Sequence, residues 1–130
     1  MNNPFKQHGA FSWSELIVDD PAEAVKFYQQ VIGWEVEAME MPGGIYHVVK
    51  AGGEPVGGIM AKPEGVQDMP NYWGTYITVD DVDATVAKAE AAGGKAVYPA
   101  MDVPGVGRLC AFFDAAGAII SVITYEEKDC

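Results

Sequence analysis

The residues best suited to chemistry in this chain are one carboxylate and several aromatic rings on predicted strands. Residues 11–18 and about 73–79 are rich in aromatic and branched side chains, which is typical of strands. Alternate residues of a strand point to opposite faces, so Trp13 and Glu15 share a face, and Tyr76 lies on the matching face of the second strand. A carboxylate in an apolar site can act as a general acid or base, or orient a donor group of a ligand. Glu15 is therefore the first candidate for catalysis and for ligand binding.

Aromatic side chains offer walls for a small-molecule site around this carboxylate. We expect Trp13, Trp73 or Tyr72, and Tyr76 to line a cavity that encloses a planar ligand. The alternative is that these large rings simply pack in the interior of the protein and leave no room for a ligand. For the helical residues Phe27 and Tyr28 we expect packing in the core.

Arg108 is a second polar candidate, at the start of the strand-like segment GRLCAFFD. Its guanidinium group could bind an anionic ligand through two parallel hydrogen bonds. It could also hold the preceding turn, Gly105-Val106-Gly107, in place. A third alternative pairs Arg108 with Glu15 as a structural salt bridge, whose loss of one partner would leave a costly lone charge.

The elements that position these residues recur twice along the chain. After the first strand, Asp20-Pro21 predicts a helix start, and Gly33 predicts the helix end. Asp81 predicts a second helix start and Gly93-Gly94 its end, and the two signals recur at one offset, 81−20 = 61 and 94−33 = 61. The same offset of 61 also pairs positions in the two first strands, namely Leu16 with Ile77 and Val18 with Val79. By strand alternation we expect these four side chains to face the helices. We infer an internal duplication.

Each predicted helix precedes three short strand candidates separated by glycine- and proline-rich turns. They are WEVEAMEM, GIYHVVKAG and PVGGIMA in the first half, and KAVYPAMDV, GRLCAFFD and AIISVIT in the second. The predicted fold class is α+β, with two βαβββ modules in a single domain over residues 1–130. The first module covers about residues 9–61, a linker about 62–72, and the second module about 73–125.

Composition and charge exclude several classes of partner. The net charge of −11 argues against nucleic acid and anionic membranes, because phosphate binding needs clustered Lys and Arg. The chain has no apolar run of spanning length and no basic-then-apolar leader, so we expect a cytoplasmic location. Cys110 and Cys130 have no disulfide or zinc spacing, and Cys110 is expected to be buried.

Ordered motifs along nearly the whole chain resemble the vicinal oxygen chelate superfamily. This is the glyoxalase/bleomycin resistance protein/dioxygenase group, and the WxEL strand and GVGR segment are similar to its small glyoxalase-like proteins. The resemblance implies that the two modules form curled mixed sheets around a shared cavity, the glyoxalase/bleomycin resistance/dihydroxybiphenyl dioxygenase fold. The motifs are Trp13-Ser-Glu15-Leu16, Asp20 with Phe27-Tyr28, Gly33-Trp34, Gly57-Gly58-Ile59-Met60, Tyr76-Ile-Thr-Val79-Asp80-Asp81-Val82-Asp83-Ala84, Gly93-Gly94-Lys95, Gly105-Val-Gly107-Arg108, and Phe113-Asp114 with Gly117-Ala118.

The chain departs from the family pattern at the positions of the metal ligands. Enzymes of the family hold a divalent ion there with His, Glu or Gln from the first and last strand of each module. The resemblance places these positions at Trp13, Gly74, near Ser121, and within Gly57–Ala61. Tryptophan, glycine and apolar side chains do not coordinate zinc, nickel or iron, and serine is rarely a ligand. We therefore expect neither metal nor other cofactor, and keep Ser121 as a ligand-binding candidate.

Three functions fit these residues. The favoured one is a glyoxalase-like protein that binds a small organic ligand in a metal-free, aromatic-lined cavity. The second is a lyase or isomerase of the glyoxalase type with Glu15 as acid–base. The third is a structural or interaction domain whose cavity its own side chains fill. Covering an open sheet edge makes a homodimer a reasonable expectation.

Overall fold

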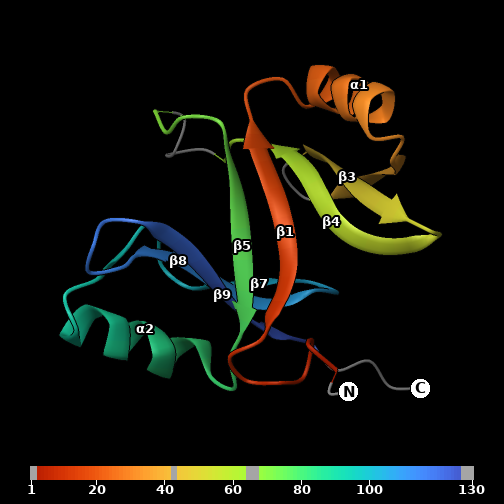
Figure 1. Ribbon diagram of the computed structural model, residues 1–130. Coiled ribbons are helices and arrows are strands. Elements are labelled where there is room, and N and C mark those ends of the chain that lie inside the picture. The colour runs from red at the N-terminus through yellow and green to blue at the C-terminus, as the bar shows by residue number, and fades with distance from the viewer. Residues whose placement is uncertain (1–2, 42–43, 64–67, 127–130) are drawn as a thin grey trace. The chain divides into compact units, whose positions relative to one another are not determined.

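The computed structural model of the chain describes residues 3–41, 44–63 and 68–126 (Figure 1). Cys130 lies outside the described residues. The chain divides into two compact units. One holds Trp13–Gly74, and the other holds the chain from Thr75 onward together with the residues up to Ser12.

The elements of the first half follow the predicted βαβββ order. They are β1 (Phe11–Val18), α1 (Pro21–Val31), β2 (Glu35–Met41), β3 (Gly44–Ala51) and β4 (Glu54–Ala61). The strands lie in the order β2-β3-β4-β1. β4 runs parallel to β1, while β2, β3 and β4 pair antiparallel.

The second half repeats this order with one strand divided. Its elements are β5 (Tyr72–Thr78), α2 (Val82–Ala91), β6 (Lys95–Ala96), β7 (Met101–Val103), β8 (Gly107–Phe113) and β9 (Ile119–Tyr125). β9 runs parallel to β5 and antiparallel to β8, and both β6 and β7 pair with β8. The segment KAVYPAMDV, expected as one strand, forms two because Pro99 between them has no N–H to donate to a ladder.

Both helices begin at the predicted aspartates. The side chain of Asp20 accepts a hydrogen bond from the Glu23 N–H, and that of Asp81 accepts one from the Ala84 N–H, as N-caps do. The helix ends differ by one residue. The glycine with positive φ after α1 is Gly33, at 84°, and after α2 it is Gly93, at 100°, the first residue of the expected Gly93-Gly94.

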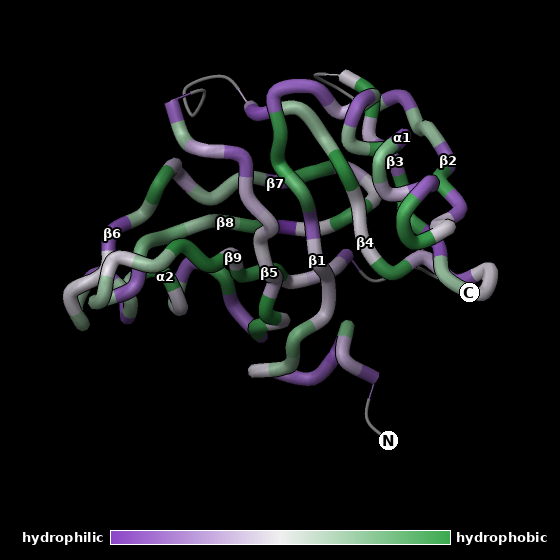
Figure 2. The backbone as a smooth tube through the Cα atoms, turned by 45° about the horizontal axis from the view of Figure 1, so that its top comes forward, coloured by the Kyte–Doolittle hydropathy of each residue, from purple (hydrophilic) through white to green (hydrophobic). Residues whose placement is uncertain are grey.

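The face assignment of both first strands is confirmed. Leu16 and Val18 of β1 join Val49 and Ile59 in a core that packs on the α1 side. In the other unit, Val79 joins a core with Val82 of α2, and Ile77 packs against it. Cys110, at 0% exposure, lies in this second core, as predicted. In Figure 2, β9 is coloured hydrophobic over most of its length, in keeping with its place at this core.

The prediction that Phe27 and Tyr28 of α1 pack in the core is only partly correct. Tyr28 packs against the core, but Phe27 is 54% and Val31 63% exposed. No residue of α1 is fully buried. Helical periodicity identifies one face of a helix, but it does not fix how much of that face the sheet covers. Within the described residues, neither helix is long and apolar enough to cross a membrane.

Candidate functional site

The strand β1 places Glu15 in a chain of hydrogen-bonded side chains within the unit Trp13–Gly74. Glu15 is only 8% exposed. The Tyr46 hydroxyl donates to the Glu15 carboxylate at 2.7 Å, and the Trp13 indole N–H donates to the same hydroxyl at 2.8 Å. A hydrogen bond to an ionised acceptor is stronger than a neutral one. These two hydrogen bonds therefore hold the Glu15 carboxylate and the Trp13 and Tyr46 rings in fixed orientations.

Tyr46 reaches Glu15 across β4 because the residue between them is a glycine. Gly58 is paired with Glu15 on one side and with Val48 on the other. Tyr46 lies two residues from Val48 and so shares its face of β3. A Cβ on Gly58 would lie 1.9 Å from the Tyr46 hydroxyl oxygen, where no atom fits. The missing side chain at Gly58 thus makes the space for the tyrosine.

Tyr72 is the aromatic residue that accompanies Glu15 from β5. Burial raises the pKa of the Tyr72 phenol, and the negative charge of Glu15 raises it further. The added Cβ of a non-glycine residue at Gly74 would lie 3.3 Å from the Tyr72 ring, so Gly74 leaves room for this ring. The sequence analysis names either Trp73 or Tyr72 as a wall of the site, and of these two the Tyr72 phenol is the one on which the Glu15 charge acts.

Trp73 belongs to another cluster, on the α1 side. Its indole N–H donates to the Tyr28 hydroxyl at 3.1 Å, and its ring meets the Tyr28 and Trp34 rings edge-on. Trp34 and Tyr28 pack against the core that contains Leu16 and Val18. Trp73 therefore lies with the residues that alternate with Glu15 along β1, and not with Glu15 itself.

The remaining candidates lie in the other unit. Tyr76 and Ser121 are paired across the parallel strands β5 and β9, so these two candidates lie together. Arg108 forms two hydrogen bonds with the Asp83 carboxylate of α2, at 3.0 and 2.9 Å, and an ion pair with Asp102 at 3.2 Å. These contacts tie β8 to α2 and to β7. The pairing of Arg108 with Glu15, which would join the two units, stays a prediction.

The positions that correspond to the family's metal ligands do not fit a divalent metal. The Trp13 indole nitrogen is a hydrogen-bond donor and is already bonded to Tyr46. Gly58 is paired with Glu15 as Ser121 is paired with Tyr76, which fixes Gly58 as the fourth position. Across residues 3–41, 44–63 and 68–126, no three His, Cys, Asp or Glu side chains are grouped as metal ligands would be.

Tyr46 is the residue of this site that the sequence expectations omit. A signal for it exists in the two consecutive glycines of β4, Gly57-Gly58. Glycine inside a strand often marks a place where another group approaches closely. Here Gly58 admits a side chain from the neighbouring strand, and a Cβ on Gly57 would lie 2.6 Å from the Ser14 carbonyl oxygen.

The chain matches a known family over most of its length. Residues 10–122 match the Glyoxalase/Bleomycin resistance protein/Dioxygenase superfamily. The chain is 45% identical over 116 residues to the Mycobacterium tuberculosis protein named "Putative glyoxylase CFP32", covering 88% of this chain and 44% of that protein. It is 33% identical over 127 residues to the anthracycline biosynthesis protein DnrV of Streptomyces peucetius, covering 88% of this chain and 46% of DnrV. The chain thus spans less than half the length of these relatives.

Solved structures show the same fold. The methylmalonyl-CoA epimerase of Mycobacterium tuberculosis aligns with a TM-score of 0.65 at 16% identity, covering 94% of this chain and 92% of the epimerase. The protein BH1468 of Bacillus halodurans aligns with a TM-score of 0.66 at 11% identity, covering 95% and 99% of the two chains. These likenesses confirm the predicted α+β class and the family fold.

Proposed function

The chain belongs to the glyoxalase/bleomycin resistance protein/dioxygenase superfamily, and within it we propose that this protein binds a planar aromatic ligand at Glu15 without a metal. The observation that carries the proposal is the chain of hydrogen bonds from Trp13 through Tyr46 to Glu15. It fixes a buried acceptor between aromatic rings. Such a combination of apolar walls and few placed polar groups is typical of small-molecule sites.

The ligand that suits this arrangement is a flat ring system with hydroxyl groups. The rings of Trp13, Tyr46 and Tyr72 offer apolar surface, and Glu15 can accept a hydrogen bond from a phenolic hydroxyl. The 33% identity to DnrV supports the same class, because that protein is named for the biosynthesis of anthracyclines. Tyr76 and Ser121 remain predicted ligand contacts, and the Arg108 guanidinium is instead held by Asp83 and Asp102.

A fluorescence titration tests this proposal directly. Replacing two of the three tryptophans, with Trp34→Phe and Trp73→Phe, leaves Trp13 as the reporter. We expect a dihydroxyanthraquinone to quench Trp13, and unsubstituted anthraquinone to bind less tightly because it has no hydroxyl to donate. Glu15→Gln should weaken binding of the dihydroxy compound about tenfold, the scale of a hydrogen bond to a charged group.

The matched control is Glu54→Gln, because Glu54 is an exposed residue of the same unit. It should leave the titration unchanged. If neither compound quenches Trp13, or if the two compounds bind equally well and Glu15→Gln has no effect, the ligand-binding proposal is wrong. The structural or interaction domain would then be the favoured function.

A second function is favoured by one feature of the same site. Glu15 is a buried carboxylate with a phenolic donor in contact, and such a group can take a proton from a carbon next to a carbonyl. The substrate to test is the hemithioacetal of methylglyoxal and glutathione, followed by its absorbance. Turnover that Glu15→Gln abolishes, while ligand quenching persists, would support a glyoxalase-type lyase or isomerase. No turnover by the unaltered protein would leave binding as its role.

A further inference from the structure

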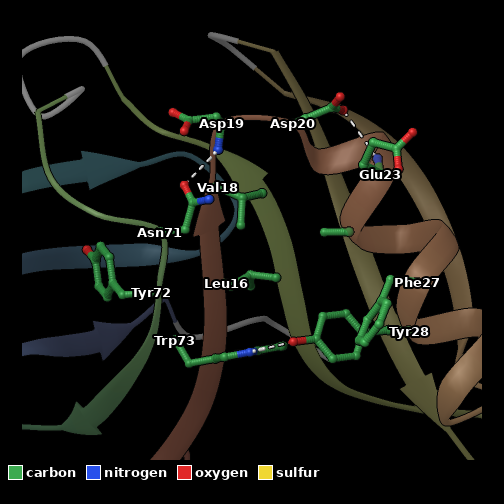
Figure 3. A pocket seen from close by; sticks show the side chains of 11 residues that line it. Leu16, Val18, Asp19, Asp20, Glu23, Phe27, Tyr28, Asn71, Tyr72 and Trp73 are labelled. Carbon is green, nitrogen blue, oxygen red and sulfur yellow. Dashed lines mark hydrogen bonds between the residues drawn. The ribbon is translucent and has the colours of Figure 1, made fainter.

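A groove lies beside Leu16 and Val18 of β1, which alternate with Glu15 along the strand, and Tyr72 is its one lining residue that the proposed function also uses. It has a volume of about 490 Å³, within the range of small-molecule sites. Figure 3 shows Leu16 and Val18 of β1 between helix α1 and the segment that carries Trp73. All its lining residues belong to the unit Trp13–Gly74.

One end of this groove is aromatic. Phe27 and Trp73 line it, and they remain 54% and 42% exposed. The Trp73 ring is held in place by its hydrogen bond to Tyr28 and by edge-on contacts with the Tyr28 and Trp34 rings, at centroid distances of 5.5 and 5.9 Å. An orientation fixed in this way keeps aromatic surface exposed without a change of conformation on binding.

The other end is acidic. Asp19, Asp20 and Glu23 line it, and Lys62 neutralises Asp19 through an ion pair of 2.9 Å. These four side chains carry −3 + 1 = −2 charges. The Glu23 N–H at the start of α1 already donates to the Asp20 carboxylate, so this donor does not await an anion. The charge at this end therefore complements a cation.

We propose that this groove binds a small organic cation, such as a quaternary or aryl ammonium compound. Its apolar body would cover Leu16 and Val18, and its charge would lie between the aromatic rings and the carboxylates. A cation near a Trp or Phe ring is attracted by the negative face of the ring, and nearby carboxylates add to this attraction. The proposal does not involve Glu15, whose side chain lies on the other face of β1 from Leu16 and Val18.

Comparison with the second module indicates that the aromatic end of the groove depends on the sequence of α1 and is not a general feature of the fold. The position 61 residues after Phe27 is Lys88 in α2, where an exposed cationic side chain replaces the exposed ring. α2 is otherwise rich in alanine, and its Val82 is buried in the core. Of the two helices, only α1 therefore presents an exposed aromatic ring.

The test uses phenyltrimethylammonium and its uncharged carbon isostere, tert-butylbenzene, with the unaltered 130-residue chain. Binding is followed by the NMR signal of the Trp73 indole N–H, assigned by its loss in Trp73→Phe. We expect the cation to shift this signal and the isostere to bind more weakly. Phe27→Leu should weaken binding of the cation about fivefold, the scale of a cation–π contact. Its matched control is Phe11→Leu, since Phe11 is 73% exposed and lies outside the groove.

The charge contribution has its own matched pair. Glu23→Gln should weaken binding of the cation and reduce its dependence on salt, while Glu40→Gln, at an exposed glutamate outside the groove, should do neither. Glu15→Gln should leave this titration unchanged, which separates the groove from the Glu15 site. Equal binding of the isostere, tighter binding of benzenesulfonate, or no effect of Phe27→Leu would each overturn the proposal.

Discussion

The two modules share one backbone frame but differ in the side chains of one face. Glu15 is paired with Gly58 across parallel strands, and Tyr76 is paired in the same way with Ser121. Continuing each register to the next strand matches β3 with β8. The equivalent pairs are Trp13 and Gly74, Glu15 and Tyr76, Tyr46 and Leu109, and Gly58 and Ser121.

The difference separates what the frame requires from what a site requires. The face that packs on the helices is kept, because Leu16 and Ile77 both serve cores. The opposite face has diverged, and the first module concentrates there a carboxylate, a phenol and an indole in one hydrogen-bonded chain. The second module has no equivalent carboxylate at Tyr76. The same backbone frame thus carries a polar face in the first module and a mostly apolar one in the second.

The largest expected effect comes from making the first module resemble the second at one position. In Gly58→Ser the added Cβ would meet the Tyr46 hydroxyl oxygen at 1.9 Å. Overpacking of this kind costs about 1–3 kcal/mol, and we expect a loss of stability toward the upper end. The mirror change, Ser121→Gly, creates no overlap and should cost less than about 1 kcal/mol. Urea unfolding of both variants measures the difference.

A second substitution separates overlap from a general effect on β4. Tyr46→Leu introduces the residue type that Leu109 has in the second module, and it removes the hydroxyl that Gly58→Ser would strike. The double variant should be more stable than Gly58→Ser alone. Additive losses would show that the close approach of Tyr46 does not explain the glycine, and the equivalence of the modules at this point would fail.

Strand alternation was sufficient to predict that Trp13 and Glu15 share a face, but it could not predict that Tyr46 joins them. It placed Trp13 and Glu15 on one face because β1 is regular, and it placed Leu16 toward the helix. Tyr46 could not be found in this way, because its contact depends on how β3 and β4 are paired. Pairing is a long-range property that the local period of a strand does not contain.

Two further predictions were only partly correct, namely the burial of Phe27 in α1 and the single strand at residues 95–103. The period of α1 identified the correct face, but the extent of burial depends on the sheet beneath, so Phe27 is exposed against expectation. The single strand expected at residues 95–103 is interrupted near Pro99. The helix starts were predicted correctly because an N-cap is a local signal, carried by Asp20 and Asp81 themselves.

Removing the N-cap of either helix should lower the free energy of unfolding by a similar, intermediate amount. Asp20→Ala and Asp81→Ala each remove one side-chain acceptor from a helix start, at 3.2 and 3.1 Å from the bonded nitrogen. Each should cost about 1 kcal/mol in urea unfolding. Asp20→Asn and Asp81→Asn, which keep the acceptor oxygen, should cost little. A cost confined to one module would show that the two helix starts are not equivalent in solution.

The titration of Tyr72 tests whether Glu15 carries a negative charge beside the Tyr72 phenol. Burial is the larger cause of the raised pKa of Tyr72, and the negative charge of Glu15 is the smaller one. Glu15→Gln should therefore lower the pKa of Tyr72 only part of the way to its ordinary value, as followed by phenolate absorbance. The neutral phenol contributes stability below its ordinary pKa, and this contribution is lost as pH rises through the raised value. An unchanged titration in Glu15→Gln would mean that Glu15 carries no charge beside this phenol.

The smallest effect is expected at the ion pair that only the second module has. Hydrogen bonding to Arg108 is the main cause that lowers the pKa of Asp83, and the position 61 residues before Asp83 is Ala22. A lowered pKa means that this contribution to stability is present above the ordinary pKa of the carboxyl group and is lost as pH falls through the lowered value. Urea unfolding of Asp83→Asn should therefore show a slightly shallower loss of stability in acid than the unaltered chain. Asp102→Asn removes the longer contact and should do less.

The size of this effect must stay below that of a helix cap, because both partners are open to solvent. The side chains of Arg108 and Asp83 are 36% and 65% exposed, so water and salt screen their attraction. High salt should remove most of the difference between Asp83→Asn and the unaltered chain. A salt-insensitive loss as large as that of Asp81→Ala would instead show that Arg108 fastens β8 to α2 by packing of its stem. The second module would then have replaced the buried polar chain of the first with a structural clamp on its other face.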